Sequence, residues 1–330
     1  MTDPEIHAQS LKRSFGTTLA VDGVDLSVAR GEIYGFLGPN GAGKSTVTRV
    51  LCTLISPTGG SARVAGFDVE TQADKVRLRI GVALQDAALD PKQTGLEMLR
   101  LQGRFYGLSK NDTERRLADL RELIDIGSAL EDRVATYSGG MKRRLDLALA
   151  LVHNPRVLFL DEPTTGLDPT SRARVWDEVR RLNSELGMTV FLTTQYLEEA
   201  DELADRVGII DHGRIVAEGT PDELKRSIGT DLVIAVVDGD PEIARVALLP
   251  LAGVERVDVN GNEVTAAVSN GPEAISPVAI ALAGAGGGLR VRELSLRTPT
   301  LDDVFLSVTG ARLADRDTDA DGNDQAEEES

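Results

Sequence analysis

The sequence predicts an α/β protein: a large domain with a helical insert, followed by a small α+β domain. Short β-branched runs alternate with helical patterns in the large domain, 1–227, and this alternation is typical of α/β folds. Between about 91 and 136 the pattern changes to amphipathic helices with Leu and Arg at helical spacing, which indicates an insert. The third observation is the βαββαβ order expected in 228–310, which predicts a ferredoxin-like module.

The large domain is expected to begin with two strands. Its third strand runs into a glycine-rich turn, and a helix follows from about Gly43. Helices of the insert are expected at 94–105 and 111–124, after which the α/β pattern resumes. The expected strands are 5–11, 24–28, 32–37, 157–160, 189–192 and 207–211.

In the small domain, the Asn260-Gly261 pair predicts a tight turn between two strands, because both residues tolerate positive φ. Ser276 is a candidate N-cap for the second helix, with Pro277 at its first position. The acidic segment 311–330 is poor in apolar residues, so a disordered tail is expected. The other expected elements are strands at 232–237, 254–259, 263–268 and 289–296 and a helix at 241–251.

Composition restricts the classes of function. The formal net charge is −17, and a field of that sign repels phosphodiester backbones, so we expect no nucleic-acid partner. The single Cys52 cannot form an internal disulfide, which fits a reducing cytosol. The sequence has neither a signal peptide nor a run of the roughly 20 apolar residues that a bilayer requires. Any role at a membrane is therefore expected to depend on a partner.

The strongest motif is GPNGAGKST, which follows an expected strand and opens a helix. It matches the phosphate-binding pattern G-x-x-x-x-G-K-[ST], whose glycines let the backbone N–H groups face phosphate oxygens. Lys44 is expected to reach the β- and γ-phosphates, and the Ser45 hydroxyl to ligate Mg²⁺. A purely structural glycine turn is the alternative, and the strand and helix on either side argue against it. The nucleotide-binding residues expected from this motif are Gly38, Pro39, Asn40, Gly41, Ala42, Gly43, Lys44, Ser45 and Thr46.

A second motif, VLFLDEP, presents two carboxylates at the end of an expected buried strand. Asp161 is placed to hold Mg²⁺, directly or through water, as in other P-loop proteins. Glu162 lies one residue further toward the γ-phosphate, where it could accept a proton from the attacking water. Alone, the pair would indicate a surface acidic pair that ends a strand. Together with the phosphate loop it favours a catalytic site.

A third motif, YSGGMKRRLDLALAL, resembles the signature of ATP-binding cassette (ABC) proteins, usually written LSGGQ. Ser138, Gly139 and Gly140 match that signature, whereas Tyr137 and Met141 replace its usual Leu and Gln. Ser-Gly-Gly at the start of a helix makes an anion site, because backbone N–H groups and a hydroxyl face outward. In the resembled family this site meets the γ-phosphate of ATP bound to the other subunit, which implies a head-to-tail homodimer.

The resemblance implies further roles. Phe15 occupies the position that stacks on adenine, with an ordinary half-buried aromatic as the alternative. Gln85 occupies the position that touches Mg²⁺ or the attacking water, so the implied metal ligands are Ser45, Gln85 and Asp161. Asp168 matches the loop that communicates across the dimer.

Gln195 is the main departure from the family pattern, which usually has Thr-Thr-His where this sequence has Thr-Thr-Gln. A glutamine amide can donate a hydrogen bond to the γ-phosphate, as imidazole would, but it cannot carry a proton near neutral pH. The alternative is that Gln195 merely weakens an ordinary site. Gln195, the YSGGM spelling and LDDVFLSVTG at 301–310 are similar to the daunorubicin-resistance subfamily of drug exporters. The segment 301–309 either caps the core of the small domain or contacts another subunit, as in that subfamily.

The resemblance covers residues 8 to about 223. It implies an ATP-hydrolysing exporter subunit that binds ATP and Mg²⁺ at the cytoplasmic face of the membrane. The insert around 96–130 would grip a separate multi-span permease. One alternative is a soluble cassette ATPase that acts on ribosomes or nucleic acid, against which the acidic charge argues. Another is a non-catalytic regulatory subunit, against which the intact Lys44, Asp161 and Glu162 argue. Drug or antibiotic, lipid and polysaccharide all stay open as cargo.

The segment from Asp317 to Glu328 fits the calcium-loop pattern D-x-D-x-D-G-x₅-E, with Gly322 in place. However, Asp324 stands where such a loop has an apolar residue, and too few residues follow for an exiting helix. A disordered acidic tail is the favoured interpretation.

Replacement of Gln195 tests its expected role. Gln195→Ala should slow ATP hydrolysis strongly, because it removes the hydrogen-bond donor to the γ-phosphate, whereas Gln195→His should not. The measurement is the steady-state ATPase rate of the purified variants. Equal rates for Gln195→Ala and the parent would remove Gln195 from the mechanism.

Overall fold

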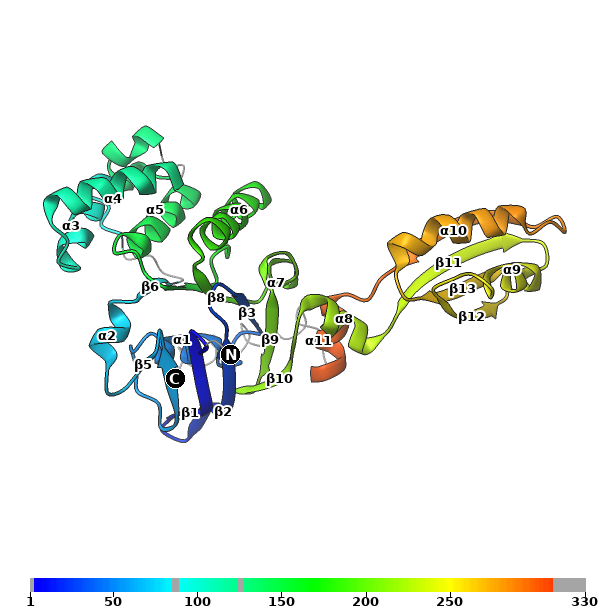
Figure 1. Cartoon of the computed structure of the whole chain (residues 1–330), viewed down its shortest axis with the longest axis horizontal. Helices are drawn as coiled ribbons and strands as arrows, with labels where there is room; N and C mark the ends of the chain where they lie inside the picture. Colours follow the sequence, from blue (N-terminus) through cyan, green and yellow to red (C-terminus); the bar gives the residue numbers. More distant parts are fainter. Residues whose placement is uncertain (1–2, 85–88, 124–126, 311–330) are drawn as a thin grey trace, which may run out of the picture. The chain divides into compact units, whose positions relative to one another are not determined.

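The computed structural model describes most of the chain, namely residues 3–84, 89–123 and 127–310. Gln85 and the acidic segment 311–330, with its calcium-loop pattern, lie outside the described residues. The described chain forms two compact units (Figure 1). One comprises the described part of 1–221 together with 308–310, and the other comprises 222–307. Each unit has its own sheets and apolar core.

A six-stranded sheet of order β10-β9-β3-β8-β7-β6 forms the centre of the larger unit. All of its strands run parallel except β10, which is antiparallel to β9. The strands β3, β7 and β8 are buried along their whole length, which explains why they are nearly continuous apolar runs. The strands are β3 (Ile33–Leu37), β6 (Ile80–Ala83), β7 (Val157–Asp161), β8 (Thr189–Thr194), β9 (Arg206–Asp211) and β10 (Arg214–Gly219).

A second sheet, antiparallel and of order β2-β1-β4-β5, shares an apolar core with one face of the central sheet. The helix α1 (Lys44–Leu51) contributes Val47 and Val50 to this core, so the phosphate loop that precedes it is held between two sheets. Of these strands, only the first two were expected from the sequence. The elements are β1 (Ile6–Phe15), β2 (Thr18–Val28), β4 (Gly59–Val64), β5 (Phe67–Asp68) and the short helix α2 (Ala73–Arg77).

Helices cover the other face of the central sheet and form the insert, which Figure 1 shows around α3, α4 and α5. The first insert helix begins with a capping box: the Thr94 hydroxyl accepts the Glu97 N–H at 3.1 Å, and the Glu97 carboxylate accepts the Thr94 N–H at 2.9 Å. The two expected insert helices correspond to α3 and α4 within one residue at each end. The elements are α3 (Gly95–Phe105), α4 (Lys110–Leu123), η1 (Gly127–Glu131), η2 (Val134–Thr136), α5 (Gly139–Leu151), α6 (Pro169–Leu186) and α7 (Leu197–Leu203).

The smaller unit has the predicted βαββαβ order. Its antiparallel sheet has the order β12-β13-β11-β14, so the first and third strands are central, and α9 and α10 pack together against it. Alternate residues Val233, Ala235 and Val237 of β11 point into the core under these helices. This is the expected ferredoxin-like fold. The elements are β11 (Asp231–Asp238), α9 (Pro241–Leu248), β12 (Val254–Asn260), β13 (Glu263–Val268), α10 (Gly271–Gly284) and β14 (Arg290–Arg297).

The expected start of α10 at Ser276 and Pro277 is wrong. Asn270 is the N-cap, and its side chain accepts the Glu273 N–H at 3.4 Å. Pro272 lies in the first turn, where a missing N–H is tolerated, whereas Pro277 lies inside the helix. The N-cap therefore lies six residues before the predicted one.

The turn between β12 and β13 is also shifted by one residue. Asn260 pairs with Glu263 as the last ladder pair, so Gly261 and Asn262 form the turn. Only Gly261 has positive φ, 59°, which is the requirement of a turn with one left-handed central residue. Asn260 keeps its strand geometry instead.

Two further helices are α8 (Pro221–Ile228) and α11 (Leu301–Thr309). The expected helix at 301–309 is confirmed, and it buries Leu301, Val304 and Phe305. None of these three side chains belongs to the apolar cluster of the small sheet, so the segment does not extend that core. Within the part of the chain that the structure describes, no helix is both long and apolar enough to cross a bilayer.

Phe191 is the ring at the centre of the larger core. It is fully buried, and its centroid lies 5.7 Å from Tyr34, 5.4 Å from Phe36 and 5.6 Å from Phe159. Phe191→Ala should lower the free energy of unfolding of this unit by about 3–5 kcal/mol, because it leaves a cavity. Phe105→Ala, at a side chain 76% exposed, should change it by less than about 0.5 kcal/mol. Denaturant titration followed by circular dichroism measures both, and equal midpoints would contradict the assignment of the core.

Candidate nucleotide-binding site

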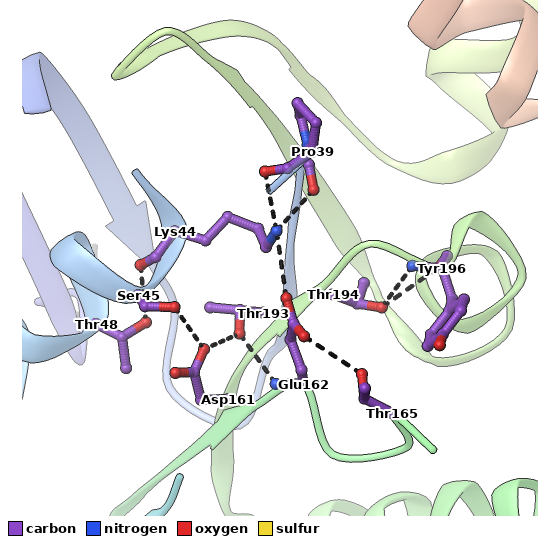
Figure 2. A network of polar contacts seen from close by, with 11 residues as sticks. Pro39, Lys44, Ser45, Thr48, Asp161, Glu162, Thr165, Thr193, Thr194 and Tyr196 are labelled. Carbon is purple, nitrogen blue, oxygen red and sulfur yellow. Dashed lines mark hydrogen bonds and ion pairs between the residues drawn. The ribbon is translucent and has the colours of Figure 1, made fainter. Parts of the chain in front are cut away.

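Residues from three separate motifs meet where β3, β7 and β8 end, and Figure 2 shows their polar contacts. The ladder fixes this alignment, because Leu37 pairs with Thr194 and Asp161 pairs with Thr193. The chain segments that follow these pairs leave the sheet at the same edge. Ligands of open parallel sheets bind at such carboxyl ends.

The phosphate loop joins β3 to α1 in a conformation that requires glycine. Gly41 and Gly43 have φ values of 77° and 106°. A Cβ at Gly38 would lie 2.5 Å from the Ile210 carbonyl oxygen, and one at Gly43 would lie 2.5 Å from that of Ala20. The backbone can therefore curl tightly enough to turn its N–H groups toward an anion.

Lys44 begins α1 and lies under this loop with only 4% of its side chain exposed. Its ammonium donates to the carbonyl oxygens of Gly38 at 2.8 Å and Pro39 at 3.1 Å. The same nitrogen forms an ion pair with Glu162 Oε1 at 3.4 Å (Figure 2). A γ-phosphate bound in the loop would share the ammonium with this carboxylate.

Ser45 and Asp161 present oxygen atoms to one point. The Ser45 hydroxyl donates to Asp161 Oδ1 at 3.4 Å, and the Thr193 hydroxyl donates to the same oxygen. Hydroxyl and carboxylate oxygens suit Mg²⁺, so two of the three predicted ligands fit the ion; Gln85, the third, lies outside the described residues. Bound there with a nucleotide, Mg²⁺ would neutralise charge on the β- and γ-phosphates.

Glu162 adopts an uncommon backbone conformation for a side chain of its type, with φ of 47°. Its N–H donates to both the carbonyl and the hydroxyl oxygen of Thr193, each at 3.1 Å, and the Thr165 hydroxyl donates to Glu162 Oε2 at 3.3 Å. Such a conformation costs about 1–3 kcal/mol and persists where the surroundings enforce it. Here it directs the carboxylate toward Lys44, where it could accept a proton from water.

Gln195 follows β8 and is half-buried. Its amide oxygen is buried without a hydrogen-bond partner among the described residues. Because an amide can rotate to put its NH₂ group in the same place, this side chain retains the capacity to bond to a phosphate oxygen. The Thr194 hydroxyl accepts the Tyr196 N–H at 2.9 Å and so fixes the backbone on both sides of Gln195.

The Ser-Gly-Gly segment begins α5. The Ser138 hydroxyl caps the helix by accepting a backbone N–H at 3.3 Å, and both Ser138 and Gly139 are exposed. A Cβ at Gly139 would lie 4.0 Å from a Leu167 methyl carbon, and one at Gly140 would lie 3.5 Å from the Ser171 hydroxyl. The exposed helix start therefore lies beside the 167–171 loop and offers unpaired N–H groups to an anion.

Tyr137, which replaces the usual Leu of the signature, is a structural residue. It is buried, and its hydroxyl donates to the Ala129 carbonyl in η1. A Cβ at Gly95 would lie only 2.7 Å from that hydroxyl, so the ring needs glycine at the start of α3. The departure thus joins the start of α5 to the insert.

Asp168 is the exposed N-cap of α6. Its carboxylate accepts the Ser171 hydroxyl at 2.6 Å and the Ser171 N–H at 3.0 Å. These hydrogen bonds, the hydroxyl's first, lower the pKa of Asp168. The negative charge is thereby fixed next to the signature segment.

Glu199 on α7 is a fully buried carboxyl group. Its Oε1 accepts the Thr164 hydroxyl at 2.9 Å and the Trp176 indole N–H at 3.0 Å. Burial raises the pKa of Glu199. This carboxyl ties α6 and α7 to the segment that follows Glu162.

Phe15 ends β1, and its ring is 45% exposed with the Arg13 guanidinium 4.5 Å from its centroid. An exposed ring can stack on a base, so the adenine role stays a prediction.

The contacts of the predicted residues form two groups. One joins the phosphate loop to Asp161 and Glu162, and the other joins the signature to the Asp168 loop.

Two residues of the site were missed from the sequence. Thr193 contacts both carboxylate-bearing residues, and Thr165 contacts Glu162. Thr193 stood in the Thr-Thr-Gln string, but a β-branched residue at the end of a strand indicates only strand structure. The Thr193 hydroxyl bonds to a residue of the neighbouring strand, and a local sequence pattern does not predict such a contact.

Thr193→Val tests this role. The change keeps the side-chain shape and removes the hydroxyl that bonds to Asp161 and to the Glu162 N–H, so kcat should fall about tenfold, the effect of roughly one to two lost hydrogen bonds. Thr193→Ser keeps the hydroxyl and should stay near the parent rate. Steady-state ATPase kinetics measure both. A Val variant as active as the Ser variant would exclude the role.

Two family models match the chain: ABC transporter over residues 21–165, and the C-terminal domain of DrrA1-3-like ATP-binding proteins over residues 219–309. Two solved structures have the same fold. An ATP-binding subunit of an ABC transporter is 28% identical, with a TM-score of 0.61 over 67% of this chain and 92% of that one. Another, cbiO1 from Clostridium perfringens, is 25% identical, with a TM-score of 0.64 over 76% and 96%.

Similar proteins extend over nearly the whole chain. Daunorubicin resistance ATP-binding protein DrrA3 of Streptomyces coeruleorubidus is 50% identical over 94% of this chain and 97% of that protein. Doxorubicin resistance ATP-binding protein DrrA of Mycobacterium tuberculosis is 44% identical over 89% of each. Nod factor export ATP-binding protein I of Sinorhizobium fredii is 41% identical over 95% and 88%. The chain therefore belongs to the ABC transporter family, as an ATP-hydrolysing protein of the DrrA type.

Proposed function

We propose that two copies of this chain bind ATP and Mg²⁺ head-to-tail and drive a separate membrane permease that exports a drug or antibiotic. The observation that carries the proposal is the convergence of Lys44, Asp161 and Glu162 at one sheet edge, while Ser138 belongs to a different group of contacts. Each chain then carries two half-sites, and a second copy is needed to join them.

Hydrolysis follows from the positions of the carboxylates. Asp161 and Ser45 would hold Mg²⁺, with Gln85 as the third ligand predicted from the sequence, and Glu162 would accept a proton from the attacking water. Lys44 stabilises the charge of the γ-phosphate, and the Gln195 amide donates to it. The Lys44–Glu162 ion pair, 3.4 Å between Nζ and Oε1, holds the carboxylate at the phosphate loop.

The dimer follows from the exposed start of α5. Ser138 and Gly139 are exposed at the first turn of α5, where backbone N–H groups lack intrahelical partners, and such a helix start favours phosphate. Asp168 lies next to them in the loop that would face the partner's phosphate loop. Phe15 and the loop from Gly38 to Thr46 supply the other half.

A groove of about 520 Å³ between the insert and the core supports a permease as partner. Phe105, 76% exposed, and Leu54, 54% exposed, open to solvent at its rim, and Leu101 adds a third exposed apolar side chain. Exposed apolar side chains that gather around a groove mark interaction sites. We propose that a cytoplasmic helix of the permease occupies this groove, so that the chain is peripheral at the cytoplasmic membrane face.

The names of the similar proteins support a drug or antibiotic as the cargo. They refer to resistance to daunorubicin, doxorubicin and linearmycin, and one refers to Nod factor export. A drug or antibiotic is therefore the proposed cargo. We also propose that the ATP-binding domain comprises residues 1–227 and the small domain residues 228–310.

A mixing experiment tests the head-to-tail site. Lys44→Ala and Ser138→Arg should each abolish hydrolysis in a homodimer. A mixed dimer contains one copy of each variant. One of its sites then carries both substitutions, whereas the other has an intact Lys44 from one copy and an intact Ser138 from its partner. Mixing equal amounts should thus restore about a quarter of the parent's functional sites in an isologous dimer.

The readout is phosphate release at saturating ATP and Mg²⁺. Each variant must first be shown to be folded by its thermal midpoint. If the mixture stays as inactive as its components while both variants dimerise, the site lies within one copy and the head-to-tail arrangement is excluded.

A further inference from the structure

Arg143 is a nearly buried arginine on the signature helix, with 11% of its side chain exposed. It lies one turn and a half beyond Ser138. Its guanidinium donates from Nη1 to the Leu84 carbonyl at 2.7 Å and from Nη2 to the Asp161 carbonyl at 3.4 Å. It also pairs with Asp146 Oδ2 at 3.2 Å. Removing a charge from water is costly unless its donors are satisfied, so these contacts hold the side chain in one place.

The two carbonyl groups belong to the ends of neighbouring parallel strands. Ala83 of β6 and Leu160 of β7 form the last ladder pair, and the guanidinium bonds to the carbonyl groups of the residues that follow them in the chain, Leu84 and Asp161. The guanidinium therefore connects the two strands just beyond their last backbone ladder pair. A planar guanidinium suits this position, because its N–H groups point to two acceptors at once, which a lysine ammonium cannot match in geometry.

Both strand ends lead directly into the proposed catalytic apparatus. Asp161 carries the Mg²⁺ carboxylate and precedes Glu162, and Leu84 precedes Gln85 in the sequence. A change at the Asp161 carbonyl would shift the Asp161 and Glu162 side chains relative to a bound phosphate. A displacement of about 1 Å at such a site can cost about a hundredfold in rate.

Asp146 connects this arginine to the groove. It lies three residues along α5, its side chain is 14% exposed, and it lines the groove together with Gln102 and Tyr106. A group that enters the groove and bonds to Asp146 competes with the guanidinium for the carboxylate. The guanidinium contacts at the Asp161 carbonyl would change with it.

We infer that Arg143 is a positioning residue for the Mg²⁺ end of the ATP site and that Asp146 makes its contacts sensitive to occupation of the groove. The second half rests on the proposed docking of the permease there. The partner is identified by chemistry: a helix with an apolar face and a hydrogen-bond donor that reaches Asp146.

The first test compares Arg143→Gln, Arg143→Lys and Lys142→Gln in the full chain. Lys142 is an exposed cation on the same helix turn and serves as the matched control. Arg143→Gln should lower kcat by about 10- to 100-fold with KM for ATP changed by less than about threefold. Arg143→Lys should recover part of this loss, because one carbonyl can still be bonded.

A spectroscopic readout separates positioning from stability. With a slowly hydrolysed ATP analogue present, Mn²⁺ affinity measured by its EPR signal should fall in Arg143→Gln and stay at the parent value in Lys142→Gln. Loss of thermal stability with unchanged kcat and Mn²⁺ affinity would overturn the positioning role. If Arg143→Gln does not fold, the same comparison with Arg143→Lys decides the question.

The second test uses the chain with its permease in membrane vesicles. Asp146→Asn should co-purify with the permease and yet lose most of the stimulation of ATPase activity that the permease gives the parent. If the permease stimulated the ATPase activity of Asp146→Asn as fully as that of the parent, the proposed role of Asp146 would be overturned. If Phe105→Asp binds the permease as well as the parent does, docking in the groove is wrong, while the kcat and Mn²⁺ results for Arg143 still test its positioning role.

Discussion

The parallel pairing of β8 with both β3 and β7 is the constraint on which the site depends. It sets Thr193 beside Asp161 and Thr194 beside Leu37, so that loops far apart in the sequence begin from one line of backbone atoms. A slip of one residue would turn every side chain of β8 to the other face of the sheet. The burial of the three strands makes such a slip costly, because their apolar side chains fill cores on both faces.

This alignment also explains how two opposite charges are kept nearly out of water. Lys44 and Glu162 have side chains that are 4% and 8% exposed, and desolvation of either alone would cost several kcal/mol. Their ion pair, the loop carbonyl groups and the Thr165 hydroxyl compensate that cost. The left-handed backbone at Glu162 is part of the same arrangement, since two hydrogen bonds from its N–H to Thr193 hold it there.

A feature could be predicted from the sequence where only a few residue types can form it. The phosphate loop needs glycine and lysine at fixed spacing, and the central strands β3, β7, β8 and β9 are nearly continuous apolar runs, so these were found. Strand order, the β4, β5, β6 and β10 strands and the conformation of Glu162 depend on pairing between distant segments, which local pattern does not contain. The predicted start of α10 at Ser276 and Pro277 failed because Asn270 caps the helix and Pro272 lies in its first turn.

Trp176 gives the molecule a property of its own, because it is the only tryptophan in the sequence. Its indole N–H bonds to Glu199, whose carboxyl group also bonds to Thr164 in the segment after Glu162. The fluorescence of an indole responds to the charge and hydration around its nitrogen. The protein therefore contains an intrinsic fluorescent probe that is linked through Glu199 to the segment after Glu162, and any change at this carboxyl group can be followed without an added label.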